Sequence, residues 1–173
     1  MTEKAPPAAP SGLENPLLAP WNTPFGLPPF DRIAAAHFAP AFAQAMAAHR
    51  AEIAAIAADP AAPSFANTVE ALERAGAPLR RVAALFFNLV SSAASPALQA
   101  VEREVAPLLA RHRAEVTLDQ GVFHRVAALH ARRDALDLAP DGARLLDRLH
   151  TALLRAGAGL DAAGRARIAA LST

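Results

Sequence analysis

Apolar positions are densest between Pro78 and Ala94, where the sequence reads PLRRVAALFFNLVSSAA. On a 3.6-residue period these side chains cover roughly 200° of the helical wheel, whereas ~100° is enough for a helix on the surface of a globular protein. The pattern predicts a helix that needs neighbours on at least two sides, around which the rest of the chain packs. Its broad apolar face is formed by Leu79, Val82, Ala83, Leu85, Phe86, Phe87, Leu89, Val90 and Ala93.

Two helices are predicted before this central one. The first carries an apolar stripe with helical spacing and stops at Asp59-Pro60, because proline cannot continue a helix. The second is short, begins at an N-cap residue, Ser64, and ends at Gly76, a residue type common at helix C-termini. The stripe of the first helix consists of Phe38, Phe42, Ala45, Met46, His49, Ile53 and Ile56.

Four more helices are predicted after the central one. Ser95-Pro96 gives the N-cap and first-turn order typical of a helix start, and the apolar stripe of that helix runs from Leu98 to Val116. The last three are expected at about Asp119–Asp134, Pro140–Ala156 and Asp161–Leu171. In the first of these three, the side chains expected to point inward are Val122, Val126 and Leu129.

Residues 15–29, NPLLAPWNTPFGLPP, combine five prolines and a glycine with large apolar side chains. Proline at this density excludes helix and disfavours a central strand, so the backbone is extended or turned. A strap laid over a helical surface is the preferred interpretation, and a flexible linker is the alternative. The fold class is therefore all-α, an irregular multi-helix bundle of about seven helices preceded by a proline-rich extended strap. Residues 1–14 are expected to be a disordered tail, and residues 15–173 a helical domain.

Composition narrows the function classes. The net charge is +1, and acids and bases are interspersed along the chain. This pattern argues against the basic face that binding to nucleic acid or to an anionic membrane would need. There is no cysteine, which excludes disulfides, cysteine-bound zinc and a thiol nucleophile. No apolar run has the length of a secretory signal or of a membrane span. The expected location is cytoplasmic.

The histidines do not have the spacing of a zinc motif. Two zinc ligands on one helix need i, i+4 spacing, as in HExxH, and no two histidines have it. His49 and His112 lie within apolar stripes, where a hydrogen-bonded core or interface histidine is preferred over a metal ligand. The six histidines are His37, His49, His112, His124, His130 and His150.

Other chemistry-bearing residues also lack a catalytic arrangement. Glu102 and Glu104 are two apart on a helix and point away from each other. The pairs Arg80-Arg81 and Arg132-Arg133 are interpreted as solvated charge rather than anion sites. No phosphate-binding loop or nucleophile elbow is present. No catalytic residue and no metal ligand is assigned in this chain.

The strap and the helical segments after it resemble a known family. NPLLAPWNTPFGLPPFDRI and HFAPAFAQAMAAHRAEIAAIAADPAAPSFANTVEALERAG are similar to the N-terminal region of the thimet-oligopeptidase family of zinc metallopeptidases. Within the family the similarity is to the bacterial peptidyl-dipeptidases, to which oligopeptidase A is related. RVAALFFNLVSSAAS, ALQAVEREVAPLLARHRAEV, RRDALDL and LLDRLHTALLRAGAGLDAAGRARIAAL fit the same pattern. The resemblance covers the chain from about Asn15 to its end.

The resemblance implies a role within a larger enzyme. Family members bind zinc through HExxH and a later glutamate, enclose a channel that admits short peptides, and in the peptidyl-dipeptidase branch release dipeptides from peptide C-termini. None of those zinc residues has a counterpart here. The chain is thus expected to be the channel-wall helical part, truncated before the zinc-binding catalytic domain, inactive alone and without its own cofactor. The implied partners are that catalytic domain and short peptides.

A second hypothesis from another class stays open. The chain could be a stand-alone helical interaction protein that binds peptides or a partner through exposed apolar surface, because contiguous exposed apolar patches mark interaction sites. The candidate interface residues are Trp21, Phe25 and Phe87.

Overall fold

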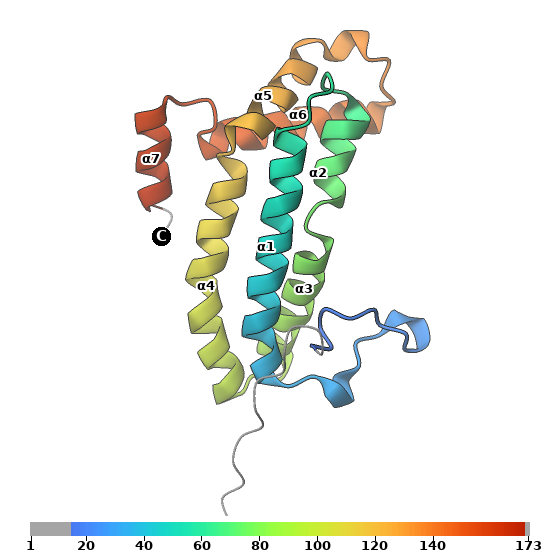
Figure 1. The fold of residues 1–173 in the computed structure, drawn as a ribbon, viewed down its shortest axis with the longest axis vertical. Coiled ribbons are helices and arrows are strands. Elements are labelled where there is room, and N and C mark those ends of the chain that lie inside the picture. The colour runs from blue at the N-terminus through green and yellow to red at the C-terminus, as the bar shows by residue number, and fades with distance from the viewer. Residues whose placement is uncertain (1–14, 172–173) are drawn as a thin grey trace, which may run out of the picture. The chain divides into compact units, whose positions relative to one another are not determined.

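The computed structural model describes residues 15–171, and the predicted tail, residues 1–14, lies outside them. Helices account for all the regular secondary structure of the described part, which confirms the all-α class (Figure 1). Short turns of 3-10 helix occur at Pro24–Gly26, Phe30–Arg32, Ala35–His37 and Arg133–Ala135. The α-helices are α1 (Phe38–Ala57), α2 (Ala71–Arg74), α3 (Ala77–Ser92), α4 (Pro96–Thr117), α5 (Gln120–Ala131), α6 (Pro140–Ala156) and α7 (Ala162–Leu171).

Local signals placed several helix ends correctly. Helix α1 ends at Ala57, just before Asp59-Pro60, and α6 has the predicted bounds. Helix α4 begins at Pro96, and the Leu98 backbone N–H donates to the Ser95 hydroxyl at 3.2 Å, as an N-cap requires. The central helix, α3, ends two residues earlier than predicted. The hydroxyls of Ser91 and Ser92 both donate to the Asn88 carbonyl there, and such bonds compete with helical ones.

The short helix predicted from Ser64 is wider than expected. Ser64 does cap it, since its hydroxyl accepts from the Asn67 N–H at 3.1 Å while Asn67 Oδ1 accepts from the Ser64 N–H at 2.7 Å. However, Phe65–Glu70 forms a π-helical turn, and only Ala71–Arg74 is α-helical. The wider turn buries two consecutive side chains completely, those of Thr68 and Val69.

The described chain divides into two compact units, and helices α1 and α4 each contribute one part to both. We call residues 15–47 with 77–106 unit 1, and residues 48–76 with 107–171 unit 2. The expectation of a single helical domain over residues 15–173 stays a prediction.

Unit 1 is built around Phe86 of α3. Its ring centroid lies 5.0 Å from that of Phe38 and 5.4 Å from that of Phe42, both on α1, and all three side chains are buried. Edge-on and tilted ring pairs at these distances stabilise a core beyond the area they bury. The broad apolar face of the central helix therefore has the neighbour on α1 that its pattern required.

The strap packs on α3, as predicted. Leu17 is fully buried, and the Arg81 guanidinium donates to the Leu17 carbonyl at 2.9 Å and to the Ala19 carbonyl at 3.3 Å. The same guanidinium lies 4.8 Å from the centre of the Trp21 ring, in a cation–π contact. The interpretation of Arg81 as solvated charge was wrong, because extended strap backbone leaves carbonyls without partners and this arginine satisfies two of them.

Unit 2 contains a second apolar core, in which α5 packs on α6. The three residues predicted to point inward from α5, Val122, Val126 and Leu129, are all buried. Helix α5 begins very close to α1, since a Cβ at Gly121 would lie 2.7 Å from the Cβ of Ala57. The buried residues of this core are Ile53, Val69, Ala75, Val122, Val126, Leu129, Leu146, Leu153 and Ala158.

Candidate functional site

Two histidines predicted to be core residues meet inside unit 2. His49 of α1 and His112 of α4 are 63 positions apart, and Nδ1 of His49 lies 3.0 Å from Nε2 of His112. His112 is 4% exposed. The preferred interpretation, a hydrogen-bonded core histidine, is therefore confirmed for His112, and its partner is the other histidine of an apolar stripe.

The hydrogen-bond partners of His112 favour one of its two tautomers. Its Nδ1 is buried and has no hydrogen-bond partner among the described residues. A buried N–H without an acceptor is rarer in folded proteins than a buried acceptor without a donor. We therefore assign the proton to Nε2, which donates to Nδ1 of His49.

The surroundings of His112 disfavour a positive charge on its ring. Burial lowers the pKa of His112, and the neighbouring His49 and Arg50 lower it further, whereas Glu115 opposes them. Arg50 and Glu115 face each other at 3.9 Å across α1 and α4. The ring of His49 also packs closely on Gly76, since a Cβ there would lie 3.0 Å from the imidazole. The φ of Gly76, 71°, is also one that residues with side chains rarely adopt.

A second histidine pair stacks where α5 packs on α6. The rings of His130 and His150 have centroids 3.9 Å apart at an interplanar angle of 18°, and the ring of Phe123 is stacked with that of His150 at a centroid distance of 6.3 Å. Nε2 of His130 lies 3.2 Å from Oδ1 of Asp147. Burial lowers the pKa of His150, and His130 adds to this while Asp147 opposes it.

Neither pair belongs to a metal site among the described residues. Across the described residues, no three His, Cys, Asp or Glu side chains come together as a metal site would need. The zinc site of the resembling family therefore does not fit the residues described here. That the chain holds no cofactor of its own stays a prediction.

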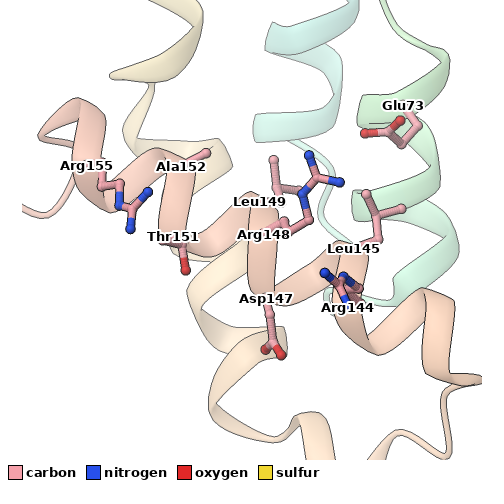
Figure 2. Close-up of a pocket in the computed structure, with 9 residues that line it drawn as sticks. All are labelled: Glu73, Arg144, Leu145, Asp147, Arg148, Leu149, Thr151, Ala152 and Arg155. Carbon is pink, nitrogen blue, oxygen red and sulfur yellow. The ribbon is translucent and has the colours of Figure 1, made fainter.

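An open depression of about 610 Å³ lies beside α6. Three arginines line it, and none of them forms an ion pair with a carboxylate of the described chain. Figure 2 shows Arg148 and Leu145 extending from α6 on the side of Glu73, whereas Asp147 points away from Glu73. With Thr151 the arginines at 144, 148 and 155 follow the spacing of one helix face. The carboxylates of Glu73 and Asp147 also line the depression, so its described lining carries both signs of charge.

The three candidate interface residues lie in different environments. Trp21 is half-buried and its indole N–H donates to the Pro16 carbonyl at 2.9 Å, so the strap itself uses this side chain. Phe87 is 42% exposed, with its ring centroid 5.3 Å from that of Phe86. Phe25 is 99% exposed. Their role as an interface stays a prediction.

The most connected polar residue of unit 2 was not predicted from the sequence. Arg125 of α5 is 7% exposed and donates to the carbonyls of Asp59 and Ala61 at 2.7 and 3.2 Å. It also bonds to the Asp59 carboxylate and the Thr68 hydroxyl, both at 3.3 Å. Its position between Val122 and Val126 on the inward face of the helix was the available signal, because a charged residue there needs buried partners.

The remaining polar candidates have local roles. The Ala34 N–H donates to the ring of His37 at 3.0 Å, and His124 is exposed. Arg132 donates to the Pro63 carbonyl and Arg133 lies 3.7 Å from Asp134, and both arginines are exposed, in agreement with their interpretation as solvated charge. Searching the helices between residues 15 and 171 finds none long and apolar enough to cross a membrane.

Comparison with known proteins identifies two relatives. The chain is 38% identical over 159 residues to dipeptidyl carboxypeptidase of Escherichia coli (strain K12), and equally identical over the same length to dipeptidyl carboxypeptidase of Salmonella typhimurium (strain LT2). The matched residues are 92% of this chain but 23% of each relative, so the chain spans less than a quarter of their length. No family model matches the chain. The identity confirms the resemblance to the peptidyl-dipeptidases.

Proposed function

We propose that this chain is the N-terminal helical portion of a zinc peptidyl-dipeptidase, an enzyme that releases dipeptides from the C-termini of short peptides. The observation that carries this proposal is the 38% identity to dipeptidyl carboxypeptidase along 92% of the chain. Its helices would form part of the channel wall, and the catalytic domain, the zinc ion and the peptide substrates would belong to the larger protein. The cytoplasmic location also stays a prediction.

The chain by itself is proposed to be inactive. Hydrolysis by a zinc peptidase needs three protein ligands and a metal-bound water, together with a carboxylate as general base. The described residues hold no group of three potential ligands, which supports this part of the proposal.

A chimera of the E. coli relative tests the proposal. Its 159 matching residues are replaced by this chain, and dipeptide release from a short peptide is measured with and without a zinc chelator. We expect the chimera to be active and the enzyme without the stretch to be inactive. A matched chimera with Phe86→Ala should lose activity, since Phe86 lies at the centre of unit 1. A folded but inactive chimera would contradict the proposal, as would metal-dependent dipeptide release by the isolated chain.

One observation favours the alternative, a stand-alone interaction protein. Phe25 is 99% exposed, which is unusual for a large apolar side chain. Sequencing the DNA after the codon for Thr173 distinguishes the two proposed functions. A continuing frame that encodes HExxH and a later glutamate supports the peptidase portion, and an unrelated sequence supports the interaction protein.

A further inference from the structure

Exposed apolar side chains concentrate at one place in the strap. Six large hydrophobic side chains of the described residues are exposed, and three of them, Phe25, Leu27 and Phe30, lie within six positions. They are 99%, 55% and 55% exposed. No charged residue occurs from Pro24 to Phe30. We call these three side chains the strap tip.

The strap tip is held in a fixed conformation. The Gly26 N–H donates to the Thr23 carbonyl at 3.0 Å, the Phe30 N–H donates to the Pro28 carbonyl at 2.8 Å, and the Thr23 hydroxyl donates to the Leu27 carbonyl. Proline residues at 24, 28 and 29 fix three further φ angles. Before the tip, the strap is fastened to α3 by Arg81. The side chains are thus presented by a rigid turn.

The backbone of Phe25 is strained. Its φ of 60° and ψ of 14° lie in the left-handed region, which glycine adopts readily and a large side chain rarely does. A residue keeps such a conformation only where its surroundings compensate for the cost, and such strain gathers at functional positions. Within unit 1 no packing of the Phe25 side chain compensates for this strain, because the side chain is exposed to solvent.

We propose that the strap tip inserts into an apolar pocket of the part of the peptidase that this chain does not span. The inference rests on the proposed function. About three quarters of the relatives' length lies outside the matched region, so such a surface is available. A rigid aromatic anchor that fills a pocket is the usual centre of a protein interface, and a preformed turn loses little entropy on binding.

The small size of the strap tip favours a partner in the same polypeptide over a second copy of the chain. A stable contact between separate molecules buries about 1,200 Å² or more, which three side chains cannot supply. A partner in the same polypeptide is held at high effective concentration, so a small apolar contact is enough. The absence of charge from Pro24 to Phe30 requires that the pocket be apolar.

Site-specific cross-linking in the active chimera tests the proposal. Phe25→p-benzoylphenylalanine places a photoreactive ring at the tip, and peptide mass mapping identifies the segments that it reaches. We expect cross-links to apolar segments of the E. coli enzyme outside its replaced stretch. The matched control is Leu160→p-benzoylphenylalanine, at a side chain of unit 2 that is 45% exposed, and it should not give these products. Cross-links between two chimeras, cross-links within this chain alone, or none at all would overturn the proposal.

A second measurement separates docking from local folding. The double variant F25S/L27S should lower the thermal midpoint of the chimera by several degrees and leave that of the isolated chain unchanged or higher. Equal effects in both would overturn the proposal. The cross-linking result does not depend on activity: an inactive chimera that forms the expected cross-links contradicts the proposed function alone, and an active chimera without them contradicts the docking alone.

Discussion

The cores of the two compact units are formed by different kinds of side chain. In unit 1 three phenylalanine rings from α1 and α3 meet at centroid distances of 5.0 and 5.4 Å, and no ionisable side chain of the described residues is as buried as they are. In unit 2 two ionisable residues, His112 and Arg125, are buried, with 4% and 7% of their surface exposed. The stabilisation from apolar contacts does not depend on pH, whereas that from a buried ionisable group depends on its protonation state. The units should therefore respond differently to truncation and to pH.

The largest expected effect is that of Phe86→Ala in unit 1. It removes the ring that both Phe38 and Phe42 contact and leaves a cavity, so the free energy of unfolding should fall by about 4 kcal/mol. The measurement is urea unfolding followed by the fluorescence of Trp21, the single tryptophan of the chain. The loss should be equal at pH 7.5 and pH 5.5. Phe87→Ala, at the 42% exposed neighbour, is the control and should cost below about 1 kcal/mol.

Arg125→Ala should have the next largest effect and concerns unit 2. Truncation leaves two carbonyls, the Thr68 hydroxyl and the partly buried Asp59 carboxylate without their donor, which should cost about 3 kcal/mol. Arg125→Met keeps the aliphatic volume and separates packing from hydrogen bonding. If circular dichroism in urea shows a loss below about 1 kcal/mol for Arg125→Ala, water replaces the guanidinium and the contrast between the units disappears.

The pH dependence of unit 2 should be a smaller effect, with a defined sign. Burial lowers the folded-state pKa of His112 and of His150, while the unfolded chain takes up these protons near pH 6.5. Below pH 6.5 the unfolded state therefore binds more protons than the folded state. The contribution of these histidines to the free energy of unfolding is fully present above that pH and decreases as the pH falls toward their folded-state pKa values. His112→Phe and His150→Phe should each reduce this decrease in urea titrations from pH 7.5 to 5. The exposed His124→Phe is the control. An unchanged pH dependence in both the His112 and the His150 variant would exclude these histidines as its source.

Structural features that depend on residues close together in the sequence could be predicted, and contacts between residues far apart in the sequence could not. The Ser95 cap, the end of α1 before Asp59-Pro60 and the inward side chains of α5 depend on spacings of a few residues. The contact of His49 with His112 joins positions 63 apart, and Arg125 reaches Asp59 across 66. Zinc-type spacing within one helix could not reveal either pair of histidines, because each pair joins two helices. The strained backbone of Phe25 was also hidden, since the glycine beside it is the residue expected at positive φ.

The smallest expected effect is a gain in stability, and it tests whether the strap tip departs from the rule of unit 1 that aromatic side chains stabilise. Phe25→Gly removes a side chain that contacts solvent and relieves a φ of 60°, so the isolated chain should become more stable by about 1 kcal/mol. The matched control is Phe30→Gly, at a residue with an ordinary negative φ, which should lower the stability because glycine is more flexible in the unfolded chain. Urea unfolding followed by Trp21 fluorescence measures both variants. If both lose stability, Phe25 supports the fold of unit 1 like the other rings, and its exposure is no longer a reason to expect a partner.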